Sequence, residues 1–311
     1  MILSGDAKAV LVLTTRLGDR NRPSLSPGAW HHLAQALSDA GLSPAAIFDT
    51  DFDADGFARV DAEQVRQLLA DTLAVFVELD ALASRGIWVL TVEDAGYPAG
   101  LRALGSAAPP CLFGVGVRDL LEGGGLAVVG SRNVEPQGAA VAQEIARAAV
   151  EAGSTLVSGG ARGVDQLAMN AAHQAGGAVL GVLSDGLEQR IRKADMLAAL
   201  DDGRTCLVVQ QHPAAGFSPG AAMARNKLVY ALADLTVVVA ADSGSGGTWS
   251  GAEEALRKAY GRVAVWRGEG EGPGNAALER MGAIAVRSVG ELAEVLVQRG
   301  QASVPEQLTI L

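Results

Sequence analysis

Cysteine, aromatic residues and long apolar runs are all scarce in this 311-residue chain. Its two cysteines, Cys111 and Cys206, are far apart and have no metal-ligand neighbours, which excludes a disulfide framework and indicates a reducing compartment. The longest apolar runs, such as residues 235–241, are as long as a strand and too short to span a bilayer. The N-terminus lacks a basic region followed by an apolar stretch, so we expect no secretory signal and a cytoplasmic protein.

A basic excess, the usual mark of a general nucleic-acid-binding protein, is also missing, because the net charge is −10. The acidic excess is concentrated at the front of the chain. Residues 1–84 hold 6 basic and 12 acidic residues, whereas the other 227 residues hold 19 and 23. The composition therefore leaves room for a local basic site on the larger part of the chain.

The sequence predicts an α/β protein. Residues 1–84 have the pattern of a small helical module, with helices over 27–41 and 61–84 and an acidic loop between them. From residue 85, short β-rich runs alternate with alanine-rich helical stretches, which predicts a Rossmann-like, doubly wound, mostly parallel sheet over 85–298 and a short tail over 299–311. The expected strands are 86–91, 126–131, 154–159, 178–184, 205–211, 235–241, 262–267 and 283–288.

The common signatures of nucleotide enzymes are absent. No GxGxxG follows the first core strand, no GxxxxGK[ST] and no GxSxG occurs, and the four histidines form no metal-binding spacing. We therefore expect no dinucleotide cofactor, no P-loop ATPase, no catalytic serine elbow and no metal. His212 precedes a proline, and we interpret it as a loop histidine rather than as a site residue.

The segments that follow the core strands share one chemistry. In such sheets ligands bind at the carboxyl ends of the strands, where glycines and helix N-termini can present N–H groups to an anion. Arginine binds phosphate with a planar fork. Two glycine-rich loops, 160–165 and 242–248, together with Arg132, Arg162 and Arg225, therefore predict a phosphate pocket, although tight turns also need glycine for conformational reasons.

Motifs in a fixed order resemble those of the DNA-processing protein A family, also called DprA or Smf. LAVVGSRNVEPQG (126–138) resembles VGSR-x-x-S-x-YG, and VSGGARGVDQLAMNAA (157–172) resembles SG-x-ARG-x-D-x-x-AH. Three further segments, 86–104, 212–234 and 243–255, match the family's D-x-x-YP-x-x-L, P-x-G-x-x-P…RNR and SGS-LITA segments. Residues 109–121 look like the short strand that precedes its core domain, and the resemblance covers about residues 80–268.

The resemblance implies a non-enzymatic protein that binds single-stranded DNA, forms a homodimer and helps to load the RecA recombinase in natural transformation. It also implies which residues bind the DNA, the basic ones through phosphates and the others through hydroxyl or backbone donors. The residues carried over are Gly130, Ser131, Arg132, Ser158, Gly159, Gly160, Arg162, Gly163, Arg225, Asn226, Lys227, Ser243, Gly244, Ser245, Gly247 and Thr248. Asp165 is expected to orient Arg162 or to cap its helix.

Several positions depart from the family pattern and indicate a divergent branch. Met169 replaces the histidine after the ARG motif, Lys227 replaces an arginine, Gln137 replaces a tyrosine, and residues 249–252 replace LITA. The tail is too short for the winged-helix domain that many members carry. An anti-phage or stress-response role for a DprA-derived protein is therefore a further hypothesis.

Residues 223–256 also resemble the Lonely Guy family, whose members cleave the N-glycosidic bond of nucleoside monophosphates. In that hypothesis Arg225 would bind the phosphate, and Glu253 would act near the ribose as a glycosidase carboxylate does. Glu253 stands five residues after Thr248 instead of two, so we interpret it mainly as a solvated helix charge near an N-terminus. Trp249 either stacks on a base or packs the start of that helix.

Overall fold

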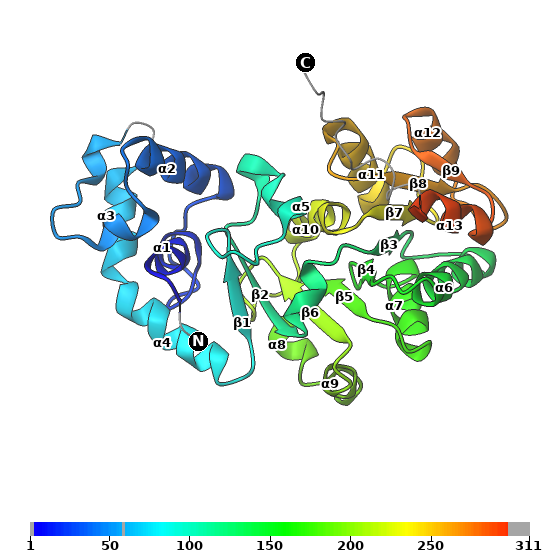
Figure 1. The fold of residues 1–311 in the computed structure, drawn as a ribbon, viewed down its shortest axis with the longest axis horizontal. Helices are drawn as coiled ribbons and strands as arrows, with labels where there is room; N and C mark the ends of the chain where they lie inside the picture. The colour runs from blue at the N-terminus through cyan, green and yellow to red at the C-terminus, as the bar shows by residue number, and fades with distance from the viewer. Residues whose placement is uncertain (1–2, 58–59, 298–311) are drawn as a thin grey trace, which may run out of the picture.

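The computed structural model describes residues 3–57 and 60–297, and the strands in these residues form one mixed sheet (Figure 1). All eight expected strands are present. A further strand, β2, lies in the segment that resembles the family's short strand. The strands are β1 (Trp88–Thr91), β2 (Cys111–Gly116), β3 (Leu126–Val129), β4 (Leu156–Ser158), β5 (Val179–Val182), β6 (Thr205–Val209), β7 (Leu235–Val238), β8 (Val263–Trp266) and β9 (Ile284–Val286).

The sheet has the order β1-β2-β6-β5-β4-β3-β7-β8-β9. The seven strands from β6 to β9 in this order pair in parallel, whereas β2 pairs antiparallel with both β1 and β6. The chain winds from β3 outward to β6 on one side and then crosses to β7, β8 and β9 on the other. The expected Rossmann-like, mostly parallel sheet is thus confirmed.

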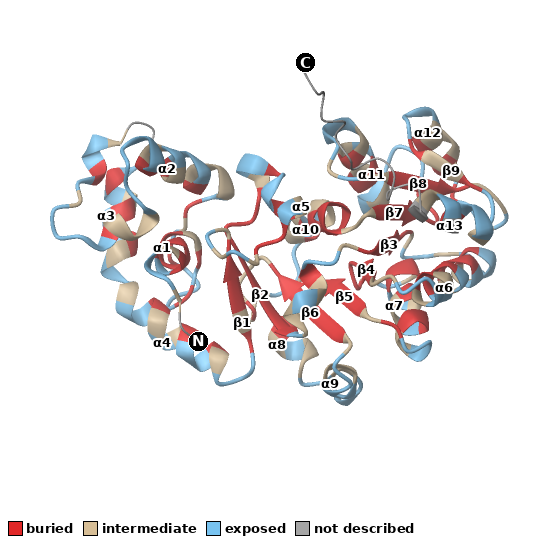
Figure 2. Ribbon diagram, viewed as in Figure 1, coloured by how far each residue is buried: buried red, intermediate tan, exposed pale blue. Residues whose placement is uncertain are grey.

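Helices cover both faces of the sheet, as the apolar strands require. On β3, Leu126 and Val128 pack into one cluster with α6 and α7, whereas Ala127 and Val129 pack into another with α10, α11 and α12. Figure 2 shows the resulting band of buried strands between partly exposed helices. The helices of this part are α5 (Ala99–Arg102), α6 (Pro136–Glu151), α7 (Val164–Gln174), α8 (Leu187–Arg190), α9 (Ala194–Asp201), α10 (Pro219–Leu232), α11 (Gly246–Lys258), α12 (Asn275–Arg280) and α13 (Val289–Val297).

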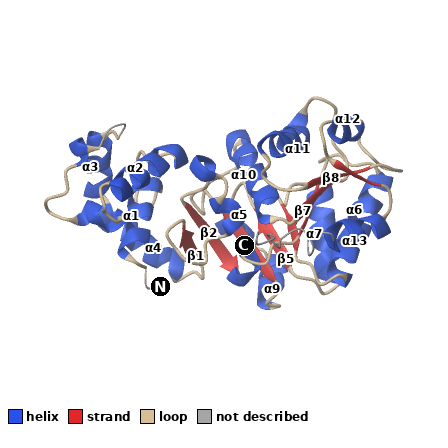
Figure 3. Cartoon of the chain, turned by 45° about the horizontal axis from the view of Figure 1, so that its top comes forward, coloured by secondary structure: helices blue, strands red, loops and turns tan. Residues whose placement is uncertain are grey.

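The front module lies at one end of the sheet, beside β1 (Figure 3). Its helices are α1 (Gly5–Thr14), α2 (Pro27–Asp39), α3 (Ala62–Ala70) and α4 (Thr72–Ala83). Their buried residues form one cluster with Val89, Phe113 and Leu207 of the sheet. The division proposed at residue 84 therefore separates two kinds of architecture that share a hydrophobic core. The proposed tail, 299–311, lies outside the described residues. None of the described helices is long and apolar enough to span a membrane.

The helix expected over 61–84 is interrupted at Asp71, which ends α3 and begins α4. Arg22, with a side chain only 2% exposed, lies at the break. Its guanidinium donates hydrogen bonds to the carbonyls of Leu68 (2.9 Å) and Val12 (3.1 Å) and lies 3.3 Å from the Asp71 carboxylate. A periodicity argument could not foresee this break, because the residue that holds it lies some fifty positions earlier in the chain.

Arg22→Ala is expected to lower the free energy of unfolding by about 2–4 kcal/mol, since it leaves buried carbonyls without donors and removes packing. Urea denaturation followed by circular dichroism measures this change. Arg20→Ala, at an exposed neighbouring position, is the matched control and should cost less than about 0.5 kcal/mol. Equal stability of both variants would show that Arg22 does not hold the break.

Candidate functional site

A cavity lies where the winding of the sheet reverses, between the carboxyl ends of β3 and β7. Open α/β sheets bind ligands in the crevice at this position. The cavity has a volume of about 480 Å³. Its lining residues come from the loop after β3, the start of α7, the loop before α10, α10 itself and the loop that enters α11. The topology therefore brings together segments that are separated by about a hundred residues in the chain.

The N-terminus of α11 faces this cavity through Ser245, Gly246, Gly247 and Thr248. Ser245 is the N-cap residue, but its side chain makes no capping hydrogen bond. The first backbone N–H groups of a helix have no partner within the helix and carry partial positive charge. Asn226 of α10 holds the first turn of α11, because its side-chain amide donates to the Gly247 carbonyl at 3.0 Å. This end of the cavity is therefore suited to an anion.

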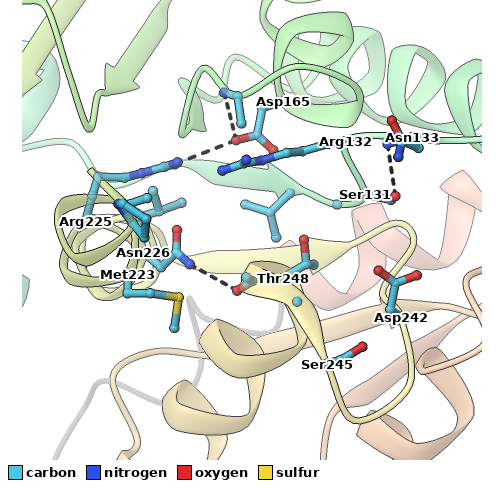
Figure 4. A pocket seen from close by; sticks show the side chains of 18 of the residues that line it. Ser131, Arg132, Asn133, Asp165, Met223, Arg225, Asn226, Asp242, Ser245 and Thr248 are labelled. Atoms are coloured by element: carbon cyan, nitrogen blue, oxygen red, sulfur yellow. Dashed lines mark hydrogen bonds and ion pairs between the residues drawn. The ribbon is translucent and has the colours of Figure 1, made fainter. Parts of the chain in front are cut away.

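A buried ion pair forms the wall opposite α11 (Figure 4). Arg225 of α10 and Asp165 of α7 are 5% and 4% exposed, and their Nη1 and Oδ2 atoms are 3.6 Å apart. Asp165 also accepts a hydrogen bond from the Ala161 N–H at 3.3 Å. Burial raises the pKa of Asp165, and the charge of Arg225 opposes that shift. Asp165 thus orients Arg225, which corrects the expectation that it orients Arg162; the N-cap of α7 is Gly163.

The glycines of the ARG motif make room for these side chains. A Cβ atom on Gly159 would lie 1.1 Å from Nη1 of Arg225, so the guanidinium occupies the space that a side chain would need. Gly163 has φ +88°, and a Cβ there would lie 2.3 Å from the Ser131 carbonyl oxygen. Both positions therefore require glycine for close packing within the wall of the cavity.

Arg132 supplies a second guanidinium at the mouth of the cavity. It is exposed and makes no ion pair with any residue in the described ranges. Figure 4 shows its side chain reaching toward that of Arg225. Burial lowers the pKa of Arg225, and repulsion by Arg132 lowers it further. An anion between the two guanidinium groups would relieve this repulsion.

An apolar surface adjoins the arginines. Phe217, which is 53% exposed, stands in the loop before α10, and the Arg132 guanidinium lies 5.7 Å from the centre of its ring. Met223, on the first turns of α10, is 41% exposed and also lines the cavity. Large exposed apolar side chains beside the unpaired Arg132 guanidinium are suited to a ligand with both charged and planar parts.

Of the residues predicted to bind phosphate, the structure brings one half together around the cavity. Those that line it are Gly130, Ser131, Arg132, Arg225, Asn226, Ser245, Gly247 and Thr248. The other predicted residues do not line it: Ser158, Gly159, Gly160, Arg162, Gly163, Lys227, Ser243 and Gly244. Ser158 is buried and donates to the Val128 carbonyl at 2.7 Å, Arg162 is hydrogen-bonded to Asn133, and Lys227 lines a different cavity.

Sequence reasoning missed several residues that line the cavity, among them Phe217, Met223 and Tyr230. Phe217 had a usable signal, because a scarce aromatic residue stands in a glycine- and proline-containing loop just before the basic helix. Tyr230 had none. It lies on the inner face of α10, and its hydroxyl has no hydrogen-bond partner in the described structure.

The structure does not place Glu253, the carboxylate that the glycosidase-like hypothesis requires, at the cavity. Glu253 is exposed on α11 and does not line the cavity, which confirms its interpretation as a solvated helix charge, although it lies in the middle of the helix and not near the N-terminus. The carboxylates that do line it are Asp242 and Asp165, and Asp165 is held by Arg225. Trp249 packs against the core and does not line the cavity, which favours the packing interpretation. His212 lies near Glu78 of the front module, away from this site.

Fold and site together define a Rossmann-like α/β protein with an arginine-lined cavity at the switch point of its sheet. The model of the family described as DNA recombination-mediator protein A matches residues 88–297. The chain therefore belongs to that family, as the ordered motifs of its sequence predicted.

Curated relatives align with part of the chain. Protein Smf of Synechocystis sp. is 31% identical over 168 residues, which are 50% of this chain and 40% of the relative. DNA processing protein DprA of Streptococcus pneumoniae is 32% identical over 162 residues, 50% of this chain and 55% of the relative. The chain thus spans about half the length of the curated relatives that it matches.

Solved structures extend the likeness in fold. The X-ray structure of DprA from Streptococcus pneumoniae superposes with a TM-score of 0.71 at 22% identity, covering 94% of this chain and 98% of the other. The structure of DprA from Helicobacter pylori, which addresses a single-stranded DNA binding mode, superposes with a TM-score of 0.56 at 22% identity. The superposition covers 68% of this chain and 96% of the other. At these identities the likeness establishes the fold.

Proposed function

We propose that the chain binds single-stranded DNA, with the sugar–phosphate backbone in the cavity between β3 and β7. The observation that carries the proposal is the pair of facing arginines, Arg132 and Arg225, opposite the uncapped N-terminus of α11. Guanidinium groups and free backbone N–H groups are the usual partners of phosphate. Membership of the DNA recombination-mediator family supports the choice of DNA over a free anion.

The exposed ring of Phe217 supplies the surface for a base. Proteins that bind single strands without sequence preference combine a basic groove with aromatic side chains on which bases stack. Arg132 lines the cavity and also lies over the Phe217 ring. A DNA strand with a phosphate between the two arginines would therefore place the neighbouring base beside this ring. The proposal is therefore one of binding without catalysis and with little sequence preference.

Membership of the family also suggests a biological role. We extend the proposal to a homodimer that delivers single-stranded DNA to a RecA-type recombinase, in DNA uptake or in a related recombination pathway. Sedimentation of the protein with and without oligonucleotide tests the dimer. Displacement of a single-strand-binding protein by recombinase, with and without this chain, tests the loading.

A salt titration of binding to fluorescent oligo-dT tests the site. Affinity should fall steeply with salt, with each phosphate contact contributing about −0.7 to the slope of log K against log salt. Arg132→Ala should weaken binding about 10-fold to 100-fold and make the slope shallower by about 0.7. Phe217→Leu should weaken binding about 5-fold or more and leave the slope unchanged, because stacking involves no counterion release.

Arg147→Ala, at an exposed position on α6 away from the cavity, is the matched control and should bind as the wild type does. Salt-insensitive binding, or no binding at low salt, would contradict the proposal. Equal losses in Arg132→Ala and Arg147→Ala would move the DNA away from this cavity.

A further inference from the structure

Helix α4 of the front module presents an apolar face to solvent (Figure 2). Leu73 and Val77 are 76% and 63% exposed, which makes them the two most exposed large apolar side chains among the described residues. Ala81, one turn further along the helix, is exposed as well. Residues four apart lie one above the other on a helix, so these three side chains form one stripe. Contiguous exposed apolar surface marks interaction sites, whereas single exposed apolar residues do not.

The opposite face of α4 packs against the core of the protein. Val75, Leu79 and Leu82 are buried in the cluster that joins the front module to the sheet. The sequence of the helix, TLAVFVELDALA, is thus apolar on two opposite sides. A helix that packs by a single face normally carries polar residues on the other face, and a helix that is apolar all round is normally buried. The stripe therefore has the composition of a face that another molecule covers.

The surroundings of the stripe are acidic. Asp80 is exposed and lies three residues after Val77, on the same side of the helix. Glu78 and Asp80 are the charged residues of α4, and the helix contains no basic one. Lys8 lies over an aromatic ring of the helix, but residues 1–84 as a whole hold 12 acidic residues against 6 basic ones. The stripe thus lies in a negative electrostatic field.

This charge decides between the classes of molecule that the stripe would fit. A nucleic acid and a bilayer with anionic lipids are both repelled by an acidic surface. Helices that lie on bilayers carry basic residues on their polar side, which α4 does not. A second copy of the chain would bring one acidic module against another, and juxtaposed like charges disfavour association. A partner with basic residues around an apolar stripe is complementary in both shape of pattern and charge.

We propose that α4 is the docking surface for a partner protein that presents a basic amphipathic helix. The apolar side chains of the partner would pack on Leu73, Val77 and Ala81, and its lysine or arginine side chains would lie near Asp80. Amphipathic helices are recognised in this way through apolar anchors at i, i+3 or i+4, and i+7. No described residue of the front module lines the cavity between β3 and β7, so the proposal does not depend on DNA binding there.

Titration of the full chain with a fluorescent synthetic peptide tests the surface. The probe is a peptide of leucine and lysine, about 18 residues long, with its leucines at i, i+3, i+4 and i+7 so that they form one face of a helix. We expect saturable binding that weakens as salt is added. Two control peptides should bind about 10-fold more weakly, one with glutamate in place of lysine and one with the same residues in scrambled order. Absence of saturable binding of the basic peptide overturns the proposal.

Substitutions on the helix then locate the binding. Leu73→Gln/Val77→Gln removes the apolar stripe and keeps residues that are compatible with a helix, and it should weaken peptide binding about 10-fold or more. Asp80→Asn should weaken it about 2-fold to 5-fold and reduce its dependence on salt. Leu42→Gln, at an exposed leucine of the same acidic module outside α4, is the matched control and should bind as the wild type does. Equal losses in the double variant and in Leu42→Gln would contradict the proposal.

Sedimentation equilibrium without peptide separates a partner from a second copy of the chain. The wild type and Leu73→Gln/Val77→Gln should have the same mass, and a lower mass for the variant would assign the stripe to self-association and overturn the proposal. Flotation with vesicles of anionic lipid should leave both proteins unbound, and binding of the wild type alone would overturn it in favour of a membrane.

The double variant should otherwise behave as the wild type does. Both side chains are exposed and lie outside the cavity between β3 and β7, so thermal unfolding and affinity for oligo-dT should be unchanged. A large fall in the unfolding temperature would mean that the stripe supports the fold, and would count against a docking role. Loss of peptide binding with unchanged affinity for oligo-dT separates this surface from the DNA site.

Discussion

Arg225→Met is expected to lower the free energy of unfolding by about 3–5 kcal/mol at pH 7, because it leaves the Asp165 carboxylate buried without its charge partner. In the wild type the two side chains are 5% and 4% exposed, and each is the main charge partner of the other. Chemical denaturation of the variant measures the loss. Arg162→Met, at an exposed position in the loop before α7, is the control and should cost less than about 0.5 kcal/mol.

The loss in Arg225→Met should depend on pH. Burial already raises the pKa of Asp165, and removing Arg225 removes the largest influence that opposes this shift. A carboxyl whose native pKa is raised contributes stability that is fully present below the unfolded pKa, about 3.9, and is lost as the pH rises through the native pKa. The difference in free energy of unfolding between the wild type and Arg225→Met should therefore become smaller below about pH 4.

The double variant Asp165→Leu/Arg225→Met provides a check on this account. Replacing both members of a buried ion pair by apolar residues costs little compared with removing one of them. The double variant should thus be more stable at pH 7 than either single variant. Strictly additive losses would contradict the view that the pair is coupled.

Gly159→Ala is expected to destabilise the protein because it disturbs the buried ion pair. The new Cβ would lie 1.1 Å from Nη1 of Arg225 and 2.7 Å from Oδ2 of Asp165, so the guanidinium must leave its place. We expect a loss of about 3 kcal/mol in stability from overpacking and from breaking the pair. Affinity for oligo-dT should fall about 10-fold or more, since the displaced Arg225 no longer faces Arg132.

Gly220→Ala serves as the control for Gly159→Ala. Gly220 lies near the start of α10, and a Cβ there would meet no atom within 4 Å. It should change stability by less than about 1 kcal/mol, in the favourable direction, because alanine is the better helix former. Wild-type stability in Gly159→Ala would mean that Arg225 can occupy a second position at no cost.

Much of the fold could be predicted from the sequence because buried parallel strands leave a clear pattern. The eight apolar runs became strands, and the alternation with helices gave the doubly wound topology. The family resemblance was needed for β2, whose sequence CLFGVG is also apolar but is not followed by a predicted helix. The break at Asp71 depends on a tertiary contact with Arg22, and local periodicity carries no information about such contacts.

The site could be predicted only in part, for a physical reason. The rule that ligands lie at the carboxyl ends of strands placed Ser131, Arg132 and the loop before α11 correctly at one cavity. It could not tell an exposed arginine from a buried one, so Arg132 and Arg225 were treated alike. Nor could it tell which way each side chain of α10 points, and Lys227 was grouped with Arg225 although it lines a different cavity.

One helix, α10, forms a wall of two cavities. Ala222, Asn226 and Val229 face the cavity between β3 and β7, whereas Ala221, Ala224 and Lys227 face a second cavity, between the front module and the sheet. A rigid helix cannot move toward one cavity without enlarging the other. An occupant of one cavity that displaced this helix would therefore change the volume of the other, and a coupling of this kind is reciprocal. Whatever factor an occupant of the second cavity imposes on affinity in the first, an occupant of the first must impose on the second.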